Sequence, residues 1–259
     1  MKTDRDVRGT VAPAGFTLVE LLVVIGILGL LAALLTPAVM RALASARNAA
    51  IKSEIDMLHM ALMNYKSEYG VAPPCGVGGI AASVRHLKRL FPRCADPADQ
   101  LKNSGMGSVS GTSAISKWLA GFRSDPQYPL CDPQDLLTAS QRVGLFDFDR
   151  ARLNSATGAY APKGKPGSPY VYIDASSYAA MPYAGGGVPG AMMMTLAGDT
   201  SPFVNVPGEA NQFVSNEFFN SDTFQILCAG ADETFGTDDD LSNFWPGTRK
   251  DYLDSLKKQ

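Results

Sequence analysis

The sequence of 259 residues contains no Lys or Arg between Pro166 and Thr248, although Asp and Glu occur repeatedly there. The whole chain has 23 Lys and Arg against 25 Asp and Glu, which gives a formal net charge of −2. Proteins that bind nucleic acid through their general charge carry a clear basic excess, so no nucleic-acid partner is expected. A long stretch with acids and without cations instead favours a divalent cation from solution.

The sequence also lacks the motifs of common catalytic sites. It has only two His residues, His59 and His86, and no P-loop, HExxH or GxSxG pattern. Residues 185–190 fit the spacing GxGxxG, but Pro189 lies inside this stretch and no helix is expected after it, so we interpret it as a loop. We do not expect an enzyme. The alternative of a membrane-anchored periplasmic enzyme would require a polar pocket with perturbed carboxylates.

One long segment lacks charge altogether. Residues 21–40 contain no Asp, Glu, Lys or Arg, and as a helix they would span roughly 30 Å, the thickness of a bilayer core. A helix in a soluble core would show a polar side, and the apolar core of a secretory signal peptide is shorter. We expect a membrane-spanning helix, at whose start Glu20 is an unusual carboxylate.

The residues around Glu20 form a contiguous pattern, Gly15-Phe16-Thr17-Leu18-Val19-Glu20, followed by the apolar run. This pattern resembles the processing signature of type IV prepilins. The resemblance implies that residues 1–15 are a leader, that a prepilin peptidase cleaves between Gly15 and Phe16, and that it N-methylates Phe16. It also implies that residues 16–40 are the transmembrane and assembly helix, bent at Pro37.

After such a cleavage the amine of Phe16 would be a positive charge in apolar surroundings. Glu20 of a neighbouring subunit could supply the counter-charge, which keeps both groups ionised and fixes the register between subunits. The expected assembly is a helical filament of many copies, since contacts of this head-to-tail kind do not close.

Beyond the apolar run, a stripe of large apolar residues continues at helical spacing, so one helix is expected over residues 16–69. The members of the stripe are Ile51, Ile55, Leu58, Leu62, Tyr65 and Tyr69. Gly70, Pro73 and Pro74 end the helix. Residues 61–73 resemble the same stretch of the major pseudopilins of type II secretion, where the helix ends in a Tyr-Lys pair, a polar turn and a Pro.

We therefore expect a pilin-like α+β fold, in which the long N-terminal helix packs on a small antiparallel sheet. Residues 41–259 would form the periplasmic domain, with a loop-rich insertion over residues 75–160. Further helical segments are expected over residues 80–91 and 113–122, and strands over residues 170–174, 192–196 and 223–228. The basic residues of the first of these helices are interpreted as a solvated face.

An acidic loop is expected over residues 227–241, where five acids fall within nine residues and Gly230 and Gly236 let the chain fold back. Its residues alone leave a solvated acidic turn as an alternative. The loop resembles the late calcium loop of major pseudopilins, which implies bound Ca²⁺. The implied ligands are the carboxylates of Asp232, Asp239 and Asp240, with Asp238 as a substitute, and the carbonyls of Leu227 and Ala229. Glu233 departs from the pattern, since many relatives have Gly there.

Four cysteines, Cys75, Cys94, Cys131 and Cys228, contain no CxxC pair, so a zinc ribbon is not expected. A domain outside the inner membrane can keep disulfides, and four cysteines allow three pairings. The most local pairing joins Cys75 with Cys94 and Cys131 with Cys228, and the other two remain open.

The function expected from these patterns is structural. The chain would be a single-pass inner-membrane subunit of a type II secretion pseudopilus, with its C-terminal domain in the periplasm. Its partners would be other copies of itself, the prepilin peptidase, other pseudopilins and the inner-membrane secretion platform. The calcium loop favours secretion over the alternative, a type IV pilus subunit for adhesion, motility or DNA uptake.

Overall fold

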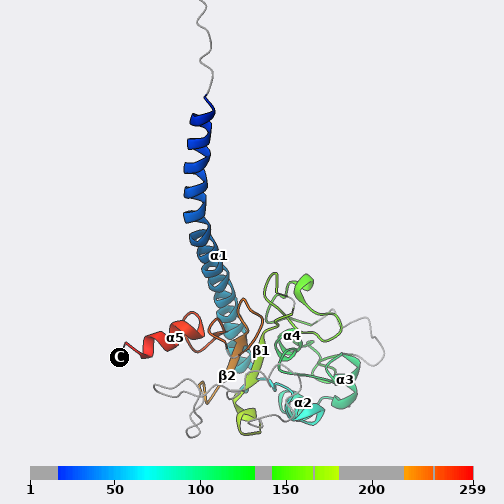
Figure 1. Cartoon of the computed structure of the whole chain (residues 1–259). Coiled ribbons are helices and arrows are strands. Elements are labelled where there is room, and N and C mark those ends of the chain that lie inside the picture. Colours follow the sequence, from blue (N-terminus) through cyan, green and yellow to red (C-terminus); the bar gives the residue numbers. More distant parts are fainter. Residues whose placement is uncertain (1–16, 132–141, 166, 181–218, 236, 259) are drawn as a thin grey trace, which may run out of the picture. The chain divides into compact units, whose positions relative to one another are not determined.

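The computed structural model describes residues 17–131, 142–165, 167–180, 219–235 and 237–258 (Figure 1). The chain divides into two compact units, residues 1–46 and residues 47–259, and each is described by itself. The expected leader, Gly15, Phe16 and the expected strand over residues 192–196 lie outside the described residues.

The described part of the first unit is the beginning of helix α1, Leu18–Tyr69, which continues into the second unit. The sequence prediction of one long helix is confirmed, including its end at Tyr69. The helix continues through Pro37, which has no N–H to donate to the preceding turn. Directly before it, the Thr36 hydroxyl donates to the backbone oxygen of Ala32 at 2.7 Å, so a side chain adds a hydrogen bond to the helix there.

In the second unit, α1 buries the apolar stripe that the spacing predicts. Ile55, Leu58, Leu62 and Tyr65 are fully buried, whereas Ile51 is partly buried against the same core. The four buried residues follow the 3-4 spacing of one helix face, so this face of α1 is the inner wall of the domain.

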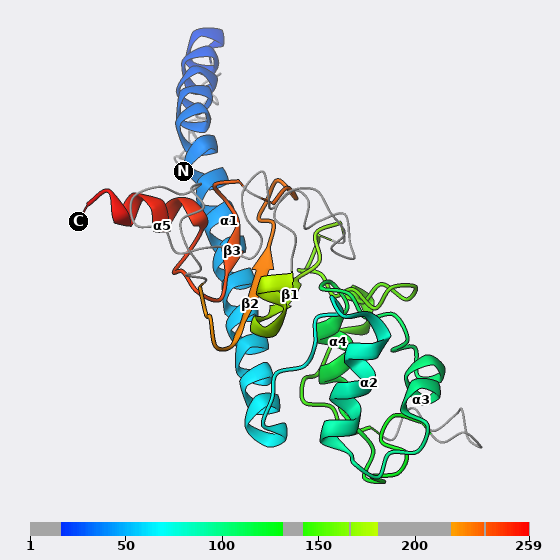
Figure 2. The same cartoon turned by 90° about the horizontal axis from the view of Figure 1, so that it is seen from below.

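The sheet on which this face packs has three antiparallel strands in the order β1-β2-β3: β1 is Val171–Asp174, β2 is Phe224–Cys228 and β3 is Leu241–Ser242 (Figure 2). Val171 pairs with Leu227, and Cys228 pairs with Leu241. Every residue of all three strands is buried. The long N-terminal helix and the small sheet therefore give the expected α+β pilin-like architecture.

The expected insertion belongs to the second unit and contributes to its core. It contains α2 (Gly79–Leu90), α3 (Pro97–Asn103) and α4 (Ala114–Leu119), which gather beyond β1 in both views (Figures 1 and 2). Trp118 of α4 is fully buried, and its indole N–H donates to the backbone oxygen of Pro74 at 3.1 Å. The helices expected over residues 80–91 and 113–122 are confirmed, whereas α3 was not expected.

The chain ends in a second unexpected helix, α5, Arg249–Leu256. Thr248 and Asp251 form a reciprocal capping box at its start. Tyr252 stacks on Trp245 with ring centroids 5.6 Å apart, so α5 is tied to the segment that follows β3. This helix is short and its anchor is aromatic packing, which a periodicity pattern does not reveal.

Candidate functional site

Glu20 closes a hydrogen-bonded ring at the start of α1. Its carboxylate accepts from the backbone N–H of Thr17 at 2.9 Å and from the Thr17 hydroxyl at 2.8 Å, and its own N–H donates to the Thr17 Oγ1 at 3.2 Å. This is the geometry of a capping box, which satisfies amides that the first turn leaves unpaired. The carboxylate is thus held in the first turn of α1. After the expected cleavage, this turn would lie next to the new N-terminus.

The first part of α1 presents apolar side chains on every side. Its large apolar residues between Leu18 and Leu43 are exposed in this unit, and none of its membrane-spanning window is buried. That window has a mean hydropathy of 2.8, and α1 is long and apolar enough to cross a membrane. So much exposed apolar surface requires a lipid or protein environment in place of water.

The acidic loop is organised by Asp239. Its Oδ2 accepts from the backbone N–H groups of Ala231 and Asp232, the second at 3.1 Å, and its Oδ1 accepts from the Thr237 hydroxyl at 2.7 Å. Burial raises the pKa of Asp239, but these hydrogen bonds outweigh burial and lower it overall. Gly230 is required here, because a Cβ would lie 2.2 Å from the backbone oxygen of Asp239.

The other expected calcium ligands are spread over the loop. Asp232 and Asp238 are exposed, whereas Asp240 is only 1% exposed. The backbone oxygen of Ala229 accepts from the Ser168 hydroxyl at 3.0 Å, and Leu227 lies within β2. Among the residues that the structure describes, no three His, Cys, Asp or Glu side chains gather as a metal site. Ca²⁺ needs six to eight oxygens, so calcium binding would require these donors to move together.

A cation from outside the acidic stretch reaches the loop. The Lys165 ammonium donates to the backbone oxygen of Ala231 at 2.6 Å and lies 3.1 Å from the Glu233 carboxylate. Glu233, the residue that departs from the expected calcium-loop pattern, has a positive φ of 61°. The sequence argument that this loop lacks a nearby cation therefore fails in three dimensions, because Lys165 is distant only along the chain.

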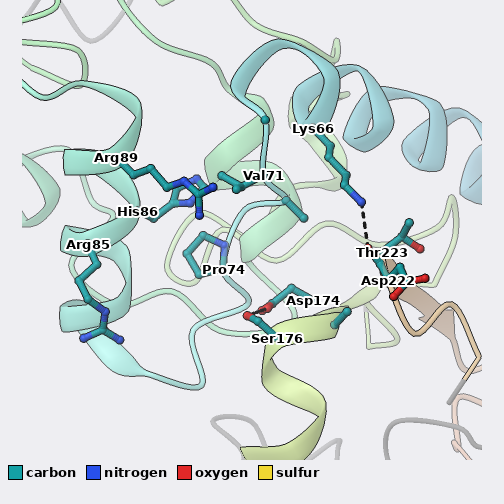
Figure 3. A pocket seen from close by; sticks show the side chains of 13 residues that line it. Lys66, Val71, Pro74, Arg85, His86, Arg89, Asp174, Ser176, Asp222 and Thr223 are labelled. Carbon is teal, nitrogen blue, oxygen red and sulfur yellow. Dashed lines mark hydrogen bonds between the residues drawn. The ribbon is translucent and has the colours of Figure 1, made fainter. Parts of the chain in front are cut away.

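A pocket of about 520 Å³ with both apolar and charged lining residues opens between the end of α1, α2 and β1 (Figure 3). Arg85 and Arg89 of α2 line it, opposite Asp174. The Asp174 carboxylate accepts from the Cys75 N–H at 2.8 Å and from the Ser177 hydroxyl at 2.7 Å.

Burial lowers the pKa of His86, which also lines this pocket, to about 4, so its ring is neutral at neutral pH. It lies 2.8 Å from the Tyr65 hydroxyl. Asp174 and His86 are thus engaged in structural hydrogen bonds.

One charged cluster of the second unit, around Glu54 on α1, was not predicted from the sequence. Its carboxylate accepts from the hydroxyls of Tyr160 at 2.9 Å and Tyr170 at 2.5 Å, and it pairs with Arg152 at 2.5 Å. The Glu54 and Arg152 side chains are only 13% and 17% exposed. The sequence signal was weak, since Glu54 merely lies beside the apolar stripe and its partners are about a hundred residues away.

The structure does not join the cysteines in the most local pairing, Cys75 with Cys94 and Cys131 with Cys228. No disulfide joins any of the four. The Cys75 thiol donates to the Ser177 hydroxyl at 3.3 Å, and Cys228 is fully buried in β2. Cys94 and Cys131 instead both contact Gln100. The turn after Pro74 carries Cys75 toward β1, where its backbone N–H donates to Asp174.

Comparison with known proteins gives one result. Residues 12–36 match the prokaryotic N-terminal methylation motif. The chain carries the type IV pilin signal. No curated protein and no solved structure matches the chain.

The match supports a type IV pilin-like protein, that is, a subunit of a pilus or a pseudopilus. It covers Gly15, Phe16 and Glu20 together with the first part of the apolar helix. Proteins with this signal are structural subunits and not an enzyme family. The signal implies membrane association and assembly with a prepilin peptidase and other pilins.

Proposed function

We propose that this pilin-like protein is a subunit of a type II secretion pseudopilus. Prepilin peptidase would remove residues 1–15 and N-methylate Phe16. The apolar part of α1 would hold the protein in the inner membrane until assembly, with the second unit in the periplasm. Copies of the chain would then form a helical filament with other pseudopilins on the inner-membrane secretion platform.

The observation that supports this proposal is the exposed apolar part of α1, which begins within the methylation motif and continues past it. A helix that is apolar on all sides needs a bilayer or a bundle of similar helices. A filament subunit uses both environments in turn, since its helix leaves the lipid as it packs on its neighbours. Glu20, held at the helix start, lies where it could meet the amine of another subunit.

A surface of the second unit also suits packing between copies. Met57 and Met60 of α1 are 53% and 64% exposed, and with Leu145 and Phe146 they line a shallow groove of about 530 Å³. Methionine adapts well to a contact surface because its side chain is flexible and polarisable. This groove supports contacts with other subunits in a pilus or a pseudopilus.

Secretion is favoured over a pilus by two resemblances, the helix end over residues 61–73 and the acidic loop. One observation favours the alternative, a DNA-uptake pilus. Arg85, Lys88, Arg89 and Arg93 are all exposed, so α2 and the turn after it form a basic surface. Such a surface attracts phosphate backbones at low salt.

The proposed function is tested in the native host by deleting the gene and restoring it as the wild type or as Glu20→Ala. We expect the deletion to lower the amount of exported protein in the medium and the wild type to restore it. Glu20→Ala should be processed normally but should fail to form filaments, because a buried ammonium without its counter-charge costs several kcal/mol. Asp99→Ala removes an exposed carboxylate from α3 and is the control.

Loss of motility or DNA uptake with unchanged export would favour the pilus alternative. Normal filaments from Glu20→Ala at matched expression would mean that Glu20 acts only as the cap of α1. Unchanged export, motility and DNA uptake in the deletion strain would contradict both functions.

Calcium binding by the acidic loop stays a prediction. The full chain in detergent should melt about 5 to 10 °C higher in Ca²⁺ than in chelator, since a hundredfold excess over Kd stabilises by about 2.7 kcal/mol. Asp232→Ala should abolish the shift, whereas Asp222→Ala, an exposed acid outside the loop, should retain it. Mg²⁺ should replace Ca²⁺ poorly because it demands tight octahedral geometry. Equal melting in Ca²⁺ and chelator would identify a solvated acidic turn.

A further inference from the structure

Two of the four cysteines meet at a single residue of α3. The side-chain amide of Gln100 donates to the Cys94 sulfur at 3.5 Å, and the Cys131 thiol donates to the backbone oxygen of Gln100 at the same distance. Cys94 and Cys131 therefore flank the same residue, although 37 positions separate them in the sequence.

The backbone segments that carry the two cysteines are held side by side by other bonds. The Ala95 N–H donates to the backbone oxygen of Gln127 at 3.0 Å, and the Gln100 side chain donates to the same oxygen at 2.9 Å. The Gln100 side-chain oxygen accepts from the Leu130 N–H at 3.4 Å. Gln100 is only 4% exposed, so this junction is part of the interior. The approach of the thiols is thus built into the fold.

The remaining cysteines have other surroundings. Cys75 is hydrogen-bonded to Asp174 and Ser177 beside β1, and Cys228 is fully buried in β2. Cys94 is the most accessible of the four, since it is half-buried whereas the others are buried. An oxidant from solution can reach Cys94 first and can then pass the reaction to Cys131.

We propose that Cys94 and Cys131 form a disulfide when the second unit is in an oxidising compartment. This proposal rests on the proposed function only for that placement. The oxidant is itself a disulfide, either of a small molecule or of a thiol-oxidising protein. The Cys94 thiolate attacks one oxidant sulfur and expels the other as a thiolate. The Cys131 thiolate then attacks Cys94 and expels the second oxidant thiolate. Two protein thiols are oxidised, one external disulfide is reduced, and the two protons pass to the departing thiolates.

The new bond would close a loop around α3 and α4, which pack in the core of the second unit. Closing a loop of this length restricts the unfolded chain more than the folded one. We expect the oxidised protein to melt roughly 5 to 15 °C above the reduced protein.

Peptide mapping of the full chain in detergent tests the pairing. Trypsin separates the four cysteines into different peptides, with Cys94 in residues 94–102 and Cys131 in residues 124–142. After oxidation of the folded protein with glutathione disulfide, these two peptides should appear linked and should separate on reduction. Separate peptides after complete equilibration, or a link to Cys75 or Cys228, would overturn the proposal.

Two variants provide an independent readout. The melting temperature of the wild type should fall on reduction, whereas Cys94→Ser and Cys131→Ser should melt at the same temperature with and without reductant. Burial raises the pKa of Cys94 to about 11, so oxidation of the wild type by glutathione disulfide should accelerate about tenfold per pH unit between pH 7 and 9. If reductant does not change the melting temperature of the oxidised wild type, the disulfide does not stabilise the protein.

The same peptide mapping can be applied to protein extracted from cell envelopes while free thiols are blocked. Its result tests the disulfide and the proposed location separately. Linked peptides support both the pairing and the location outside the cytoplasm. Linked peptides after oxidation in vitro, but blocked thiols in the envelope, would support the pairing and overturn the location.

Discussion

Gly15→Asp is expected to leave the leader attached and to abolish assembly. The substitution places a charged side chain directly before the expected cleavage site, where the family signal has a residue without a side chain. The uncleaved chain would keep the charges of its leader in front of the apolar helix, and no Phe16 amine would form to pair with Glu20. Intact-mass spectrometry of membrane extracts should show the full chain, whereas the wild type should begin at N-methylated Phe16.

Gly9→Asp is a closely matched control for this experiment. It makes the same substitution within the same leader, six positions before Gly15. We expect it to be processed like the wild type, because it lies away from the scissile bond. Removal of the leader from Gly15→Asp in a host with an active prepilin peptidase would refute the assigned cleavage site.

Glu54→Ala is expected to destabilise the second unit by roughly 2 to 4 kcal/mol, because it strands Arg152 and removes the acceptor of two tyrosine hydroxyls in a poorly hydrated site. The melting temperature of the full chain should fall by about 5 to 15 °C. Asp56→Ala is the matched control on the same helix. Its carboxylate is 57% exposed and pairs with Lys52 on the helix surface, so its loss should change stability by less than about 1 kcal/mol.

The pH dependence of the same site has a definite sign. Burial raises the pKa of Glu54, but the hydrogen bonds from Arg152, Tyr170 and Tyr160 outweigh burial, so its pKa lies below the ordinary value of 4.5. The folded state therefore favours the carboxylate, and this contribution is complete above pH 4.5 and is lost as the pH falls through the lowered pKa. The difference in stability between the wild type and Glu54→Gln should shrink from pH 6 to pH 3. A difference that grows on acidification would contradict the network.

The helical and strand elements that a local pattern specifies were predictable. The apolar run and the 3-4 stripe predicted α1 to its final residue, because every contact that defines a helix lies within four positions along the chain. The methylation motif is likewise contiguous, so the processing site could be assigned from Gly15 to Glu20. The buried strands β1 and β2 were recognisable as short apolar runs. The two-residue strand β3 is too short to carry a pattern.

The groups brought together from distant parts of the chain were not predictable. Glu54 finds Arg152, Tyr160 and Tyr170 only after α1 packs on the sheet, and Lys165 reaches the acidic loop across 68 positions. The sequence showed no cation near this loop, because only distance along the chain can be judged from it. Coulomb energy depends on distance in space.

The cysteines show most clearly what the sequence determines and what only the tertiary structure determines. The sequence by itself determined that four thiols exist and that the chain carries the signal and the apolar helix of a pilin-like subunit. Only the tertiary structure decided which thiols are neighbours, because α3 brings Cys94 and Cys131 to the two ends of Gln100 while Cys75 turns toward β1. Local patterns specify helices and processing sites through short-range geometry. Pairings between distant residues arise only when burial of the apolar faces fixes how those helices pack.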